Sequence, residues 1–344
     1  MNSASADFWR RYHAFRTARH IETRPDDPIL PDEVEERVLR SDRNFEIIYR
    51  YEIARDDEML SWFGCSTIKP GAPGYDQNRH LMSASCAVRR ERRRQGIGRS
   101  WLPLVLELMD RHGCTVLTVG TDEDSGHAFL RWLGAEARFN DVENRLQLAD
   151  VDWAMVDRWV AEGAVRNPQT TLEFYAEPLP EAMWDEYSTQ LSLLMNTIPF
   201  EELDMGESVV TPPQVREWYE RMAAVQEQSH SVMAREPDGS LSGLTEVVWS
   251  PHAPQVIDQR FTGVRTDARG RGIGKWIKAA MLQHVRELHP EARWVSTYNA
   301  GSNEPMLAIN RQLGFRRHRV GKTYQMTRDR LAARVAARAA PHQL

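Results

Sequence analysis

Hydrophobic positions along the chain alternate between helix-like stripes and short strand-like runs, and both halves show the same order of elements. Runs of β-branched and aromatic residues predict strands, and segments rich in proline and glycine separate them, as in hairpins. The strands predicted in the first half cover residues 45–53, 60–68, 81–88 and 114–119. Those predicted in the second half cover residues 171–177, 231–235, 243–249, 256–264 and 294–298.

An amphipathic helix is predicted after the strand that ends at Val88, and again after the strand that ends at Val264. In each helix the apolar residues recur at helical spacing and form one stripe. The first stripe contains Trp101, Leu102, Val105, Leu108 and Met109. The second contains Trp276, Ile277, Met281, Val285 and Leu288. Further helices are predicted at residues 6–20, 33–39, 151–167, 180–194 and 213–228.

The loop between strand and helix is repeated as well. It covers residues 88–98 in the first half and 264–274 in the second, and both loops end in Gly-Ile-Gly. Two loops with one register, in the same order of elements, indicate an internal repeat, and the length of 344 residues fits two domains. The expected bounds are 1–155 for the first domain, 156–170 for a connector, 171–327 for the second domain and 328–344 for a basic tail.

Composition narrows the class of protein. The chain is 41% hydrophobic and 27% charged, as in globular domains, and its net charge of −5 disfavours nucleic-acid binding. No apolar run reaches the ~18 residues that span a bilayer, and the first residues lack the apolar segment of a signal peptide. The 3 cysteines form no pair motif, and the 11 histidines show no metal-ligand spacing. We therefore expect a cytoplasmic protein without a metal site that binds neither nucleic acid nor membrane.

Glycines between a strand and a helix leave backbone N–H groups free to converge on an anion, and the helix dipole favours negative charge there. Neighbouring basic residues add charge-assisted hydrogen bonds. A P-loop would need Ser or Thr after Lys275, but Trp276 stands there. A dinucleotide fingerprint would need a third glycine where Trp101 and Ile277 stand. The arginine-rich run 89–94 has a second interpretation, a nucleic-acid patch, which the glycines that follow it disfavour.

Both loops instead match the pattern R/Q-x-x-G-x-G/A. The matching residues are Arg93, Gly96 and Gly98 in the first loop and Arg269, Gly272 and Gly274 in the second. This pattern resembles the segment with which the GNAT superfamily of acyl-CoA-dependent N-acyltransferases grips the CoA pyrophosphate. Residues 299–315 resemble the second CoA segment of that family. The doubled arrangement is similar to that of mycothiol synthase and other tandem GNAT proteins.

The resemblance implies an α/β fold with a mixed α+β sheet, in two tandem domains that are each a mostly antiparallel twisted sheet flanked by helices. It also implies an acyl-CoA donor, for which we expect acetyl-CoA. The residues assigned to CoA in the second half are Thr262, Gly263, Val264, Arg269, Gly270, Arg271, Gly272, Ile273, Gly274, Lys275, Asn299, Asn303, Met306 and Asn310. Those assigned in the first half are Val88, Arg93, Arg94, Gln95, Gly96, Ile97, Gly98 and Arg99.

Acyl transfer to an amine needs a base, because an alkyl amine has a pKa of ~10, and it needs a donor for the oxyanion. The resemblance places that donor, a backbone N–H, near Gly263 and Val264, and a carboxylate base on the central strands. Glu246 and Asp258 are the candidates, with a cross-strand salt bridge as the structural alternative. Glu246 interrupts an apolar run, where an unpaired carboxylate is costly. Asp258 lies six residues before Val264, so strand alternation places both on one face.

In the GNAT pattern a tyrosine of the second CoA segment protonates the leaving thiolate. Asn310 occupies that position here, so Tyr324, on the expected last strand, is the substitute candidate. The need is mild, because a thiol of pKa ~8.5 leaves readily as its anion. The first half carries Met82 where the second carries Asp258, and its second segment, 126–130, is shortened. We therefore expect the chemistry in the second half.

These residues predict a GNAT-type N-acetyltransferase in which a small-molecule amine attacks the thioester directly. The acidic segment 201–207 is a candidate entrance for a cationic acceptor, or else a solvated loop. Two alternatives remain open. The protein could bind CoA for structure or regulation without catalysis, or it could acylate a protein-bound or carrier-bound acceptor. The expected assembly is a monomer or a homodimer.

Overall fold

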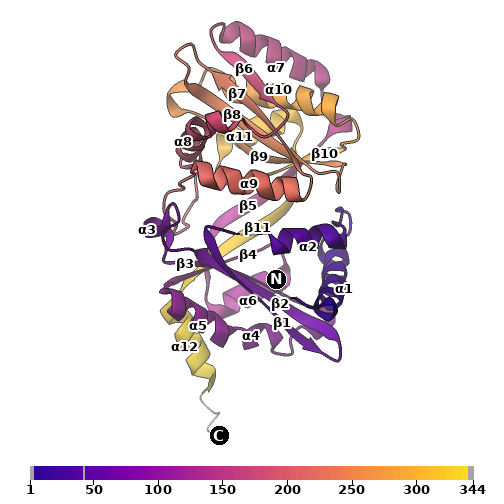
Figure 1. Ribbon diagram of the computed structural model, residues 1–344, viewed down its shortest axis with the longest axis vertical. Coiled ribbons are helices and arrows are strands. Elements are labelled where there is room, and N and C mark those ends of the chain that lie inside the picture. Colours follow the sequence, from indigo (N-terminus) through magenta and orange to yellow (C-terminus); the bar gives the residue numbers. More distant parts are fainter. Residues whose placement is uncertain (1–3, 42, 340–344) are drawn as a thin grey trace. The chain divides into compact units, whose positions relative to one another are not determined.

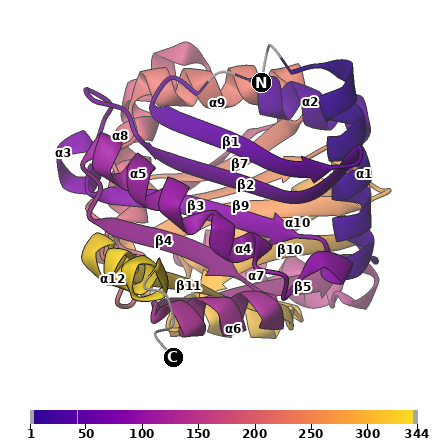
Figure 2. The same ribbon diagram turned by 90° about the horizontal axis from the view of Figure 1, so that it is seen from below.

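The computed structural model describes residues 4–41 and 43–339, with the backbone alone at 338 and 339. The described residues form two compact units, whose elements are labelled in Figure 1 and seen from another side in Figure 2. The N-terminal unit consists of the residues up to Asn140, the segment Glu202–Glu207 and the residues from Gly321 onward. The C-terminal unit consists of Asp141–Glu201 and Ser208–Val320.

The N-terminal unit contains a sheet with the strand order β1-β2-β3-β4-β11, in which the described strands are antiparallel except for the pair β3-β4. Its strands are β1 (Glu46–Arg55), β2 (Glu58–Ile68), β3 (Leu81–Val88), β4 (Val116–Thr121) and the end of β11 (Arg316–Thr327). Its helices are α1 (Ala6–Thr23), α2 (Asp32–Arg40), α3 (Tyr75–Asn78), α4 (Ile97–Ser100), α5 (Leu102–His112), α6 (Asp124–Leu133) and α12 (Arg328–Ala339). The predicted helix after Gly98 is thus interrupted at Trp101, but its whole apolar stripe is buried as expected.

The C-terminal unit contains a sheet with the order β5-β10-β9-β8-β7-β6, in which the pair β9-β10 is parallel. Its strands are the end of β5 (Glu136–Gln147), β6 (Thr171–Tyr175), β7 (Gln228–Arg235), β8 (Leu241–Trp249), β9 (Val256–Val264) and β10 (Trp294–Ala300). Its helices are α7 (Trp153–Arg166), α8 (Trp184–Met195), α9 (Pro212–Ala224), α10 (Ile273–Leu288) and α11 (Glu304–Leu313). The predicted mixed α/β class, with mostly antiparallel sheets flanked by helices, is confirmed.

Strands β5 and β11 each pass from one unit to the other. Residues 322–327 of β11 pair with β4, so the last strand of the chain completes the sheet of the N-terminal unit. Residues 141–147 of β5 pair with β10, so a strand from the first half completes the C-terminal sheet. The compact units therefore differ from the two halves of the sequence repeat. The expected domain bounds describe that repeat and stay a prediction.

Two apolar clusters cover opposite faces of the C-terminal sheet. On one face Val247 and Ile257 pack with residues of α10, and on the other Met233 and Leu244 pack with residues of α8 and α9. The periodic stripe of α10 explains the first cluster, with one exception. Leu288, predicted to be part of the stripe, is 45% exposed, because the helix ends there and turns away through His289.

The parallel strands of the C-terminal unit separate toward their carboxyl ends. The ladder between β9 and β10 ends at Gln259 and Thr297, although β9 continues to Val264 and β10 to Ala300. Beyond that point β9 pairs with β8, and β10 pairs with β5. In the N-terminal unit the ladder between β3 and β4 likewise stops before β3 ends. Each unit therefore has backbone groups on two diverging strands next to its glycine loop.

A β-bulge distinguishes β9 from β3. Glu246 lies opposite Phe261 and the next residue of β8 lies opposite Gln259, so Arg260 is an extra residue. The described ladder between β2 and β3 has no such shift. A bulge inverts the alternation of side chains beyond it. The prediction that Asp258 and Val264 share a face is therefore wrong: Val264 packs on the α10 side together with Ile257, the neighbour of Asp258.

Candidate active site

The two glycine loops have the same backbone conformation. Each begins with a 3-10 turn, Arg90–Arg92 or Thr266–Ala268, and continues into the helix at the isoleucine of Gly-Ile-Gly. In both loops the residue after the motif arginine and the glycine that precedes the helix have positive φ. These angles are 64° at Arg94, 86° at Gly96, 80° at Gly270 and 84° at Gly272. Such angles favour glycine, and a side chain there costs about 1–2 kcal/mol, which the first loop accepts at Arg94.

The motif arginine has the same structural contact in both loops. Nε of Arg93 donates to the carbonyl of Val88 at 3.2 Å, and Nε of Arg269 donates to that of Val264 at 3.3 Å. Arg93 also forms ion pairs with Glu22 and Glu123. The motif arginine therefore ties the loop to the end of its strand, and Arg93 has protein carboxylates as its ionic partners.

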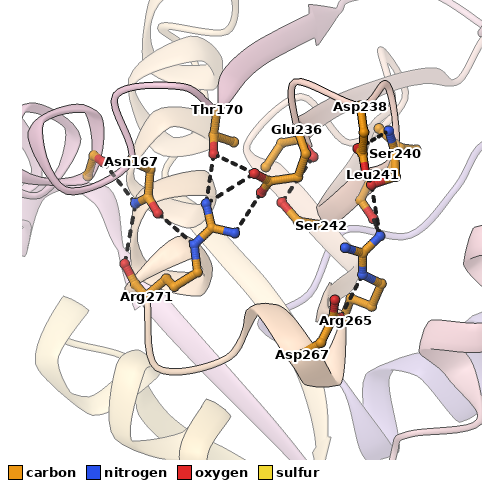
Figure 3. A network of polar contacts seen from close by, with 12 residues as sticks. Asn167, Thr170, Glu236, Asp238, Ser240, Leu241, Ser242, Arg265, Asp267 and Arg271 are labelled. Carbon is orange, nitrogen blue, oxygen red and sulfur yellow. Dashed lines mark hydrogen bonds and ion pairs between the residues drawn. The ribbon is translucent and has the colours of Figure 1, made fainter.

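Arg271 is held by a polar network within the C-terminal unit (Figure 3). Its guanidinium donates to both carboxylate oxygens of Glu236, at 2.9 and 3.1 Å, to Thr170 at 2.9 Å and to Asn167 at 3.0 Å. Asn167 in turn donates to the backbone carbonyl of Arg271 at 3.3 Å. Arg271 was expected to donate a hydrogen bond to phosphate. In the structure its guanidinium donors are engaged in this network, which ties the loop to other segments of the unit. Lys275 is similarly engaged, since its Nζ lies 2.7 Å from Gln312.

The backbone amides at the start of α10 remain available. The first N–H groups of a helix have no partner within it. In the part of the chain that the structure describes, no hydrogen bond engages the amides of residues 270–275. A Cβ at Gly270 would meet no atom within 4 Å, so the space beside the loop is open. At Gly272 it would lie 3.0 Å from NH1 of Arg166, a cation at the end of α7 that the sequence pattern did not single out.

The N-terminal loop has more free charge. The side chains of Arg90, Arg94 and Arg99 are exposed, and within residues 4–41 and 43–339 they form no ion pair or hydrogen bond. Gln95 donates to the carbonyl of Glu91. Free guanidinium groups beside a glycine-rich helix start are suited to an anion. This unit therefore retains an electropositive loop.

The second CoA segment lies at the end of β10 and in α11. The side-chain oxygen of Asn299 accepts a hydrogen bond from Nδ2 of Asn310, on α11, at 2.9 Å. Asn310, at the position of the usual tyrosine, is buried, whereas Asn303 precedes α11 and Met306 lies in its first turn, both partly exposed. The buried amide fixes α11 against β10. It offers no acid to a leaving thiolate, because an amide does not titrate.

Glu246 lies on β8 beside the bulge, and its side chain is partly exposed. Its Oε1 accepts hydrogen bonds from the hydroxyls of Tyr187 at 2.8 Å and Ser231 at 3.1 Å. Burial raises the pKa of this carboxyl, and the two hydroxyl donors partly oppose the rise. Its backbone carbonyl accepts from Nε2 of Gln259, which also reaches the carbonyl of Phe261 and thereby braces the bulge.

Asp258 faces the same side of the sheet as Glu246 but has a different environment. It lies opposite Val248, two residues along β8 from Glu246. Its carboxylate pairs with Nε of Arg260 at 3.0 Å and is 34% exposed. Burial raises its pKa, Arg260 lowers it and the carboxylate of Glu143 raises it. Asp258 therefore forms an ion pair, but with Arg260 of its own strand and not the cross-strand salt bridge considered as the structural alternative.

Tyr324, the candidate acid, belongs to the N-terminal unit. It lies on the part of β11 that belongs to the N-terminal unit, opposite Val119 of β4. The side chain is buried, and its hydroxyl lies 3.1 Å from Nδ1 of His127. Tyr324 was considered as the acid because the last strand was expected in the second domain; that part of the strand belongs to the N-terminal unit, and the role of Tyr324 stays a prediction.

The N-terminal unit lacks the corresponding carboxylate. Ser61 and Gly243 lie opposite the valines that end β3 and β9. Three residues further along, β8 carries Glu246 and β2 carries Gly64. Met82 is fully buried in the apolar core, as expected for a residue without a chemical role. The acidic segment also has a structural explanation, because residues 202–207 pack within the N-terminal unit.

No described helix is long and apolar enough to cross a membrane. Among residues 4–41 and 43–339, no group of three or more His, Cys, Asp or Glu side chains is arranged to hold a metal ion.

Comparisons with known proteins agree with this architecture. Residues 9–135 match the acetyltransferase (GNAT) family, and a search of curated proteins gives no match. A tandem GNAT protein from the clavulanic acid biosynthesis pathway, solved without AcCoA, superposes with a TM-score of 0.71 and 20% identity, covering 93% of this chain and 95% of that one. A GCN5-related N-acetyltransferase from Sphaerobacter thermophilus superposes with a TM-score of 0.62 and 14% identity, covering 94% of each chain.

The family match lies in the first half, which is the half that lacks the carboxylate. The structural likeness, in contrast, extends over nearly the whole chain. The chain therefore has the fold of tandem GNAT proteins, and its residues 9–135 match the acetyltransferase (GNAT) family.

Proposed function

We propose that this protein transfers an acyl group from acyl-CoA, with acetyl-CoA as the expected donor, to a small-molecule amine, and that the chemistry takes place in the C-terminal unit. The observation that carries the proposal is the position of Glu246. Its carboxyl group is partly exposed and lies beside the bulge, where β9 begins to separate from β10. The pKa of this carboxyl is raised by burial, which favours proton uptake by the carboxylate.

The glycine loop suits the pyrophosphate of the donor. The amides of residues 270–275 would hold it, supported by the dipole of α10 and by the cation of Arg166. Arg271 and Arg269 would keep the loop in shape through Glu236 and the end of β9. Bound there, the donor supplies a thioester to the region between the diverging strands.

The chain's own groups then have distinct roles. Glu246 takes the proton of the acceptor amine, so that a neutral nitrogen attacks the thioester carbon. An extra residue at a bulge leaves backbone groups outside the ladder, and an N–H of β9 between Arg260 and Val264 stabilises the oxyanion. The thiolate leaves without an acid from Tyr324, since a thiol of pKa ~8.5 tolerates this.

A second candidate function is CoA binding without turnover by the N-terminal unit. Two observations favour it: the free side chains of Arg90, Arg94 and Arg99, and the family match at residues 9–135. In this alternative the first loop binds CoA for structure or regulation, and Gly64 explains why the unit has no base.

The test is calorimetric titration of the full chain with acetyl-CoA, followed by thiol-release assays with amines of increasing size, from diamines to aminosugars and a carrier-bound amine. The proposal expects release that depends on both acetyl-CoA and a small amine. Binding of acetyl-CoA without release for any acceptor would favour the second candidate. Release only with the carrier-bound amine would replace the small acceptor with a macromolecular one.

A further inference from the structure

The two hydrogen bonds to Glu246 both end on the same oxygen. Tyr187, from α8, and Ser231, from β7, donate to Oε1 at 2.8 and 3.1 Å. Both donor side chains are buried, at 4% and 2% exposure, so they are held in place by packing. In the part of the chain that the structure describes, Oε2 accepts no hydrogen bond, and it is not among the buried oxygens left without a partner. One oxygen is therefore fixed and the other remains accessible.

Among the residues that the structure describes, the groups that shift the pKa of this carboxyl include no cation. Tyr187 from α8 and Tyr219 from α9 are the titratable groups that interact with it, whereas β7 contributes Ser231 and β9 contributes Phe261 directly opposite. Burial and the carboxylate itself raise the pKa of Tyr187 well above its usual value, so its hydroxyl remains a donor. Within the described chain, the hydroxyls of Tyr187 and Ser231 therefore stabilise the charge on Glu246.

We propose that Tyr187 and Ser231 are positioning residues that hold Oε1 of Glu246 and so present Oε2 as the proton-accepting oxygen for the acceptor amine. This rests on the proposed function of the same site. In the step concerned, an N–H bond of the ammonium breaks, its electron pair stays on nitrogen and an O–H bond forms at Oε2. The proton then leaves to solvent from the accessible side of the carboxyl.

The hydroxyls have a second effect in this arrangement. Hydrogen bonds to the charged form of a carboxyl lower its pKa, and burial raises it. Without the two donors, a carboxyl in this position would bind a proton at higher pH and lose its function as a base in more of the neutral range. Tyr219 offers a comparison, because it is a partly buried tyrosine near Glu246 that engages Leu179 and Ser229 instead of the carboxylate.

The experiment compares Tyr187→Phe and Ser231→Ala with Tyr219→Phe in the full chain. Each variant is titrated at the Glu246 carboxyl by ¹³C NMR of labelled glutamate, assigned with Glu246→Gln. The loss of one hydrogen bond to a charged group should raise the carboxyl pKa by about one unit or more. We expect this rise for Tyr187→Phe and Ser231→Ala, no change for Tyr219→Phe and a recovered value for Ser231→Thr.

The pH dependence of kcat/KM with the best amine is the second readout. Its acid limb should move upward by the same amount as the carboxyl pKa, with little change in acetyl-CoA affinity. An unchanged carboxyl titration in both Tyr187→Phe and Ser231→Ala overturns the positioning role, whatever the activity. A shifted titration with an unshifted rate profile keeps the hydrogen bonds but overturns their catalytic role and the assignment of Glu246 as base. If one variant does not fold, the other decides the question.

Discussion

At the scale of single residues, the structure separates the two candidate carboxylates, of which the sequence favoured Glu246 because it interrupts an apolar strand. Asp258 has an arginine partner at 3.0 Å, whereas Glu246 has hydroxyl partners and a free oxygen. The ion pair engages the carboxylate of Asp258 and partly opposes the rise of its pKa that burial causes. Glu246 is therefore the better candidate, and Asp258 is better explained as part of a strand-surface ion pair.

Replacing Glu246 with glutamine should lower kcat by ~10²–10⁴-fold, because a positioned general base contributes that much. The affinity for acetyl-CoA should change little, since Glu246 is assigned to the acceptor amine and not to CoA. Wild-type activity should fall on the acid side at a pH above the usual carboxyl range, because burial raises the pKa of Glu246 and the deprotonated form is the active one. pH–rate profiles of Glu246→Gln and Asp258→Asn check this. Wild-type rates for Glu246→Gln at every pH would contradict the assignment.

At the scale of elements, the two loops share a backbone but differ in the use of their side chains. The conformation follows from positive φ at matching positions, whereas the free charge is greater in the N-terminal loop. Backbone amides and side-chain cations contribute separately to anion binding. The two loops can therefore be tested independently with the same type of substitution.

The variants Gly96→Trp and Gly272→Trp place a bulky side chain where φ is positive and beside the free amides. Each should remove acetyl-CoA binding at its own loop, and calorimetry of both variants and of the double variant counts the sites. We expect Gly272→Trp to abolish turnover and Gly96→Trp to retain it, because only the C-terminal unit carries the carboxylate. Equal loss of turnover in both variants, at unchanged thermal stability, would contradict the assignment of the chemistry to the C-terminal unit.

A cluster of three histidines connects β7 with the end of α10. Nε2 of His230 lies 2.8 Å from Nε2 of His289, and the ring of His284 packs 5.4 Å from that of His230. Burial and the two neighbouring rings lower the pKa of His230 to about 4, and burial lowers that of His284 and His289. Glu287 and Glu291 oppose the shifts at the latter two. These shifts favour the neutral form of the three imidazoles in the folded protein.

Stability should fall as the pH falls below ~6.5, the usual histidine pKa. Below that pH His230 binds a proton in the unfolded chain, whereas in the folded protein it binds one only near pH 4. Above pH ~6.5 the buried His230 costs no stability. Between pH ~6.5 and about 4 the free energy of unfolding falls with pH, by up to about 1.4 kcal/mol per pH unit for one such group. Urea unfolding between pH 7.5 and 5 measures it. His230→Leu should flatten the dependence, and His318→Gln, at an exposed histidine, should not. An equal slope in all three proteins would refute the explanation.

At the scale of the whole molecule, neither half of the repeat contains a complete sheet of its own. The N-terminal sheet needs residues 322–327 of β11, and the C-terminal sheet needs residues 141–147 of β5. A sheet without its outer strand exposes unpaired N–H and C=O groups and loses apolar contacts. In this case the lost contacts include Tyr324 and Met326 in the core of the N-terminal unit.

The fragment 1–155 should therefore fail to unfold cooperatively, although it contains the whole first half of the repeat. Adding a peptide of residues 316–339 should restore a cooperative transition, because it supplies the missing strand and helix α12. Urea unfolding followed by tryptophan fluorescence measures both states, and a scrambled peptide of the same composition is the control. Cooperative unfolding of the fragment alone would contradict the importance of the exchanged strand.

The sequence by itself determined the local features of this protein. The bounds of β3 and β9 match their predicted residues, and both loops lead into helices, which begin at Ile97 and Ile273, two residues earlier than predicted. Periodicity and the conformational freedom of glycine act over a few residues, so they can be read from the chain directly. The fold class followed from the same local patterns, because both loops recur in one order.

Only the tertiary structure decided which residues meet. The bulge at Arg260 turned Asp258 away from the face of Val264, and the strand exchange moved Tyr324 into the other unit. Arg271 donates to Glu236, and Glu246 accepts hydrogen bonds from Tyr187 and Ser231. Each of these outcomes depends on strand register or on contacts between segments far apart in the chain, and a one-residue shift in register reverses a side chain's direction. Local patterns therefore specified the elements, whereas non-local pairing specified the site.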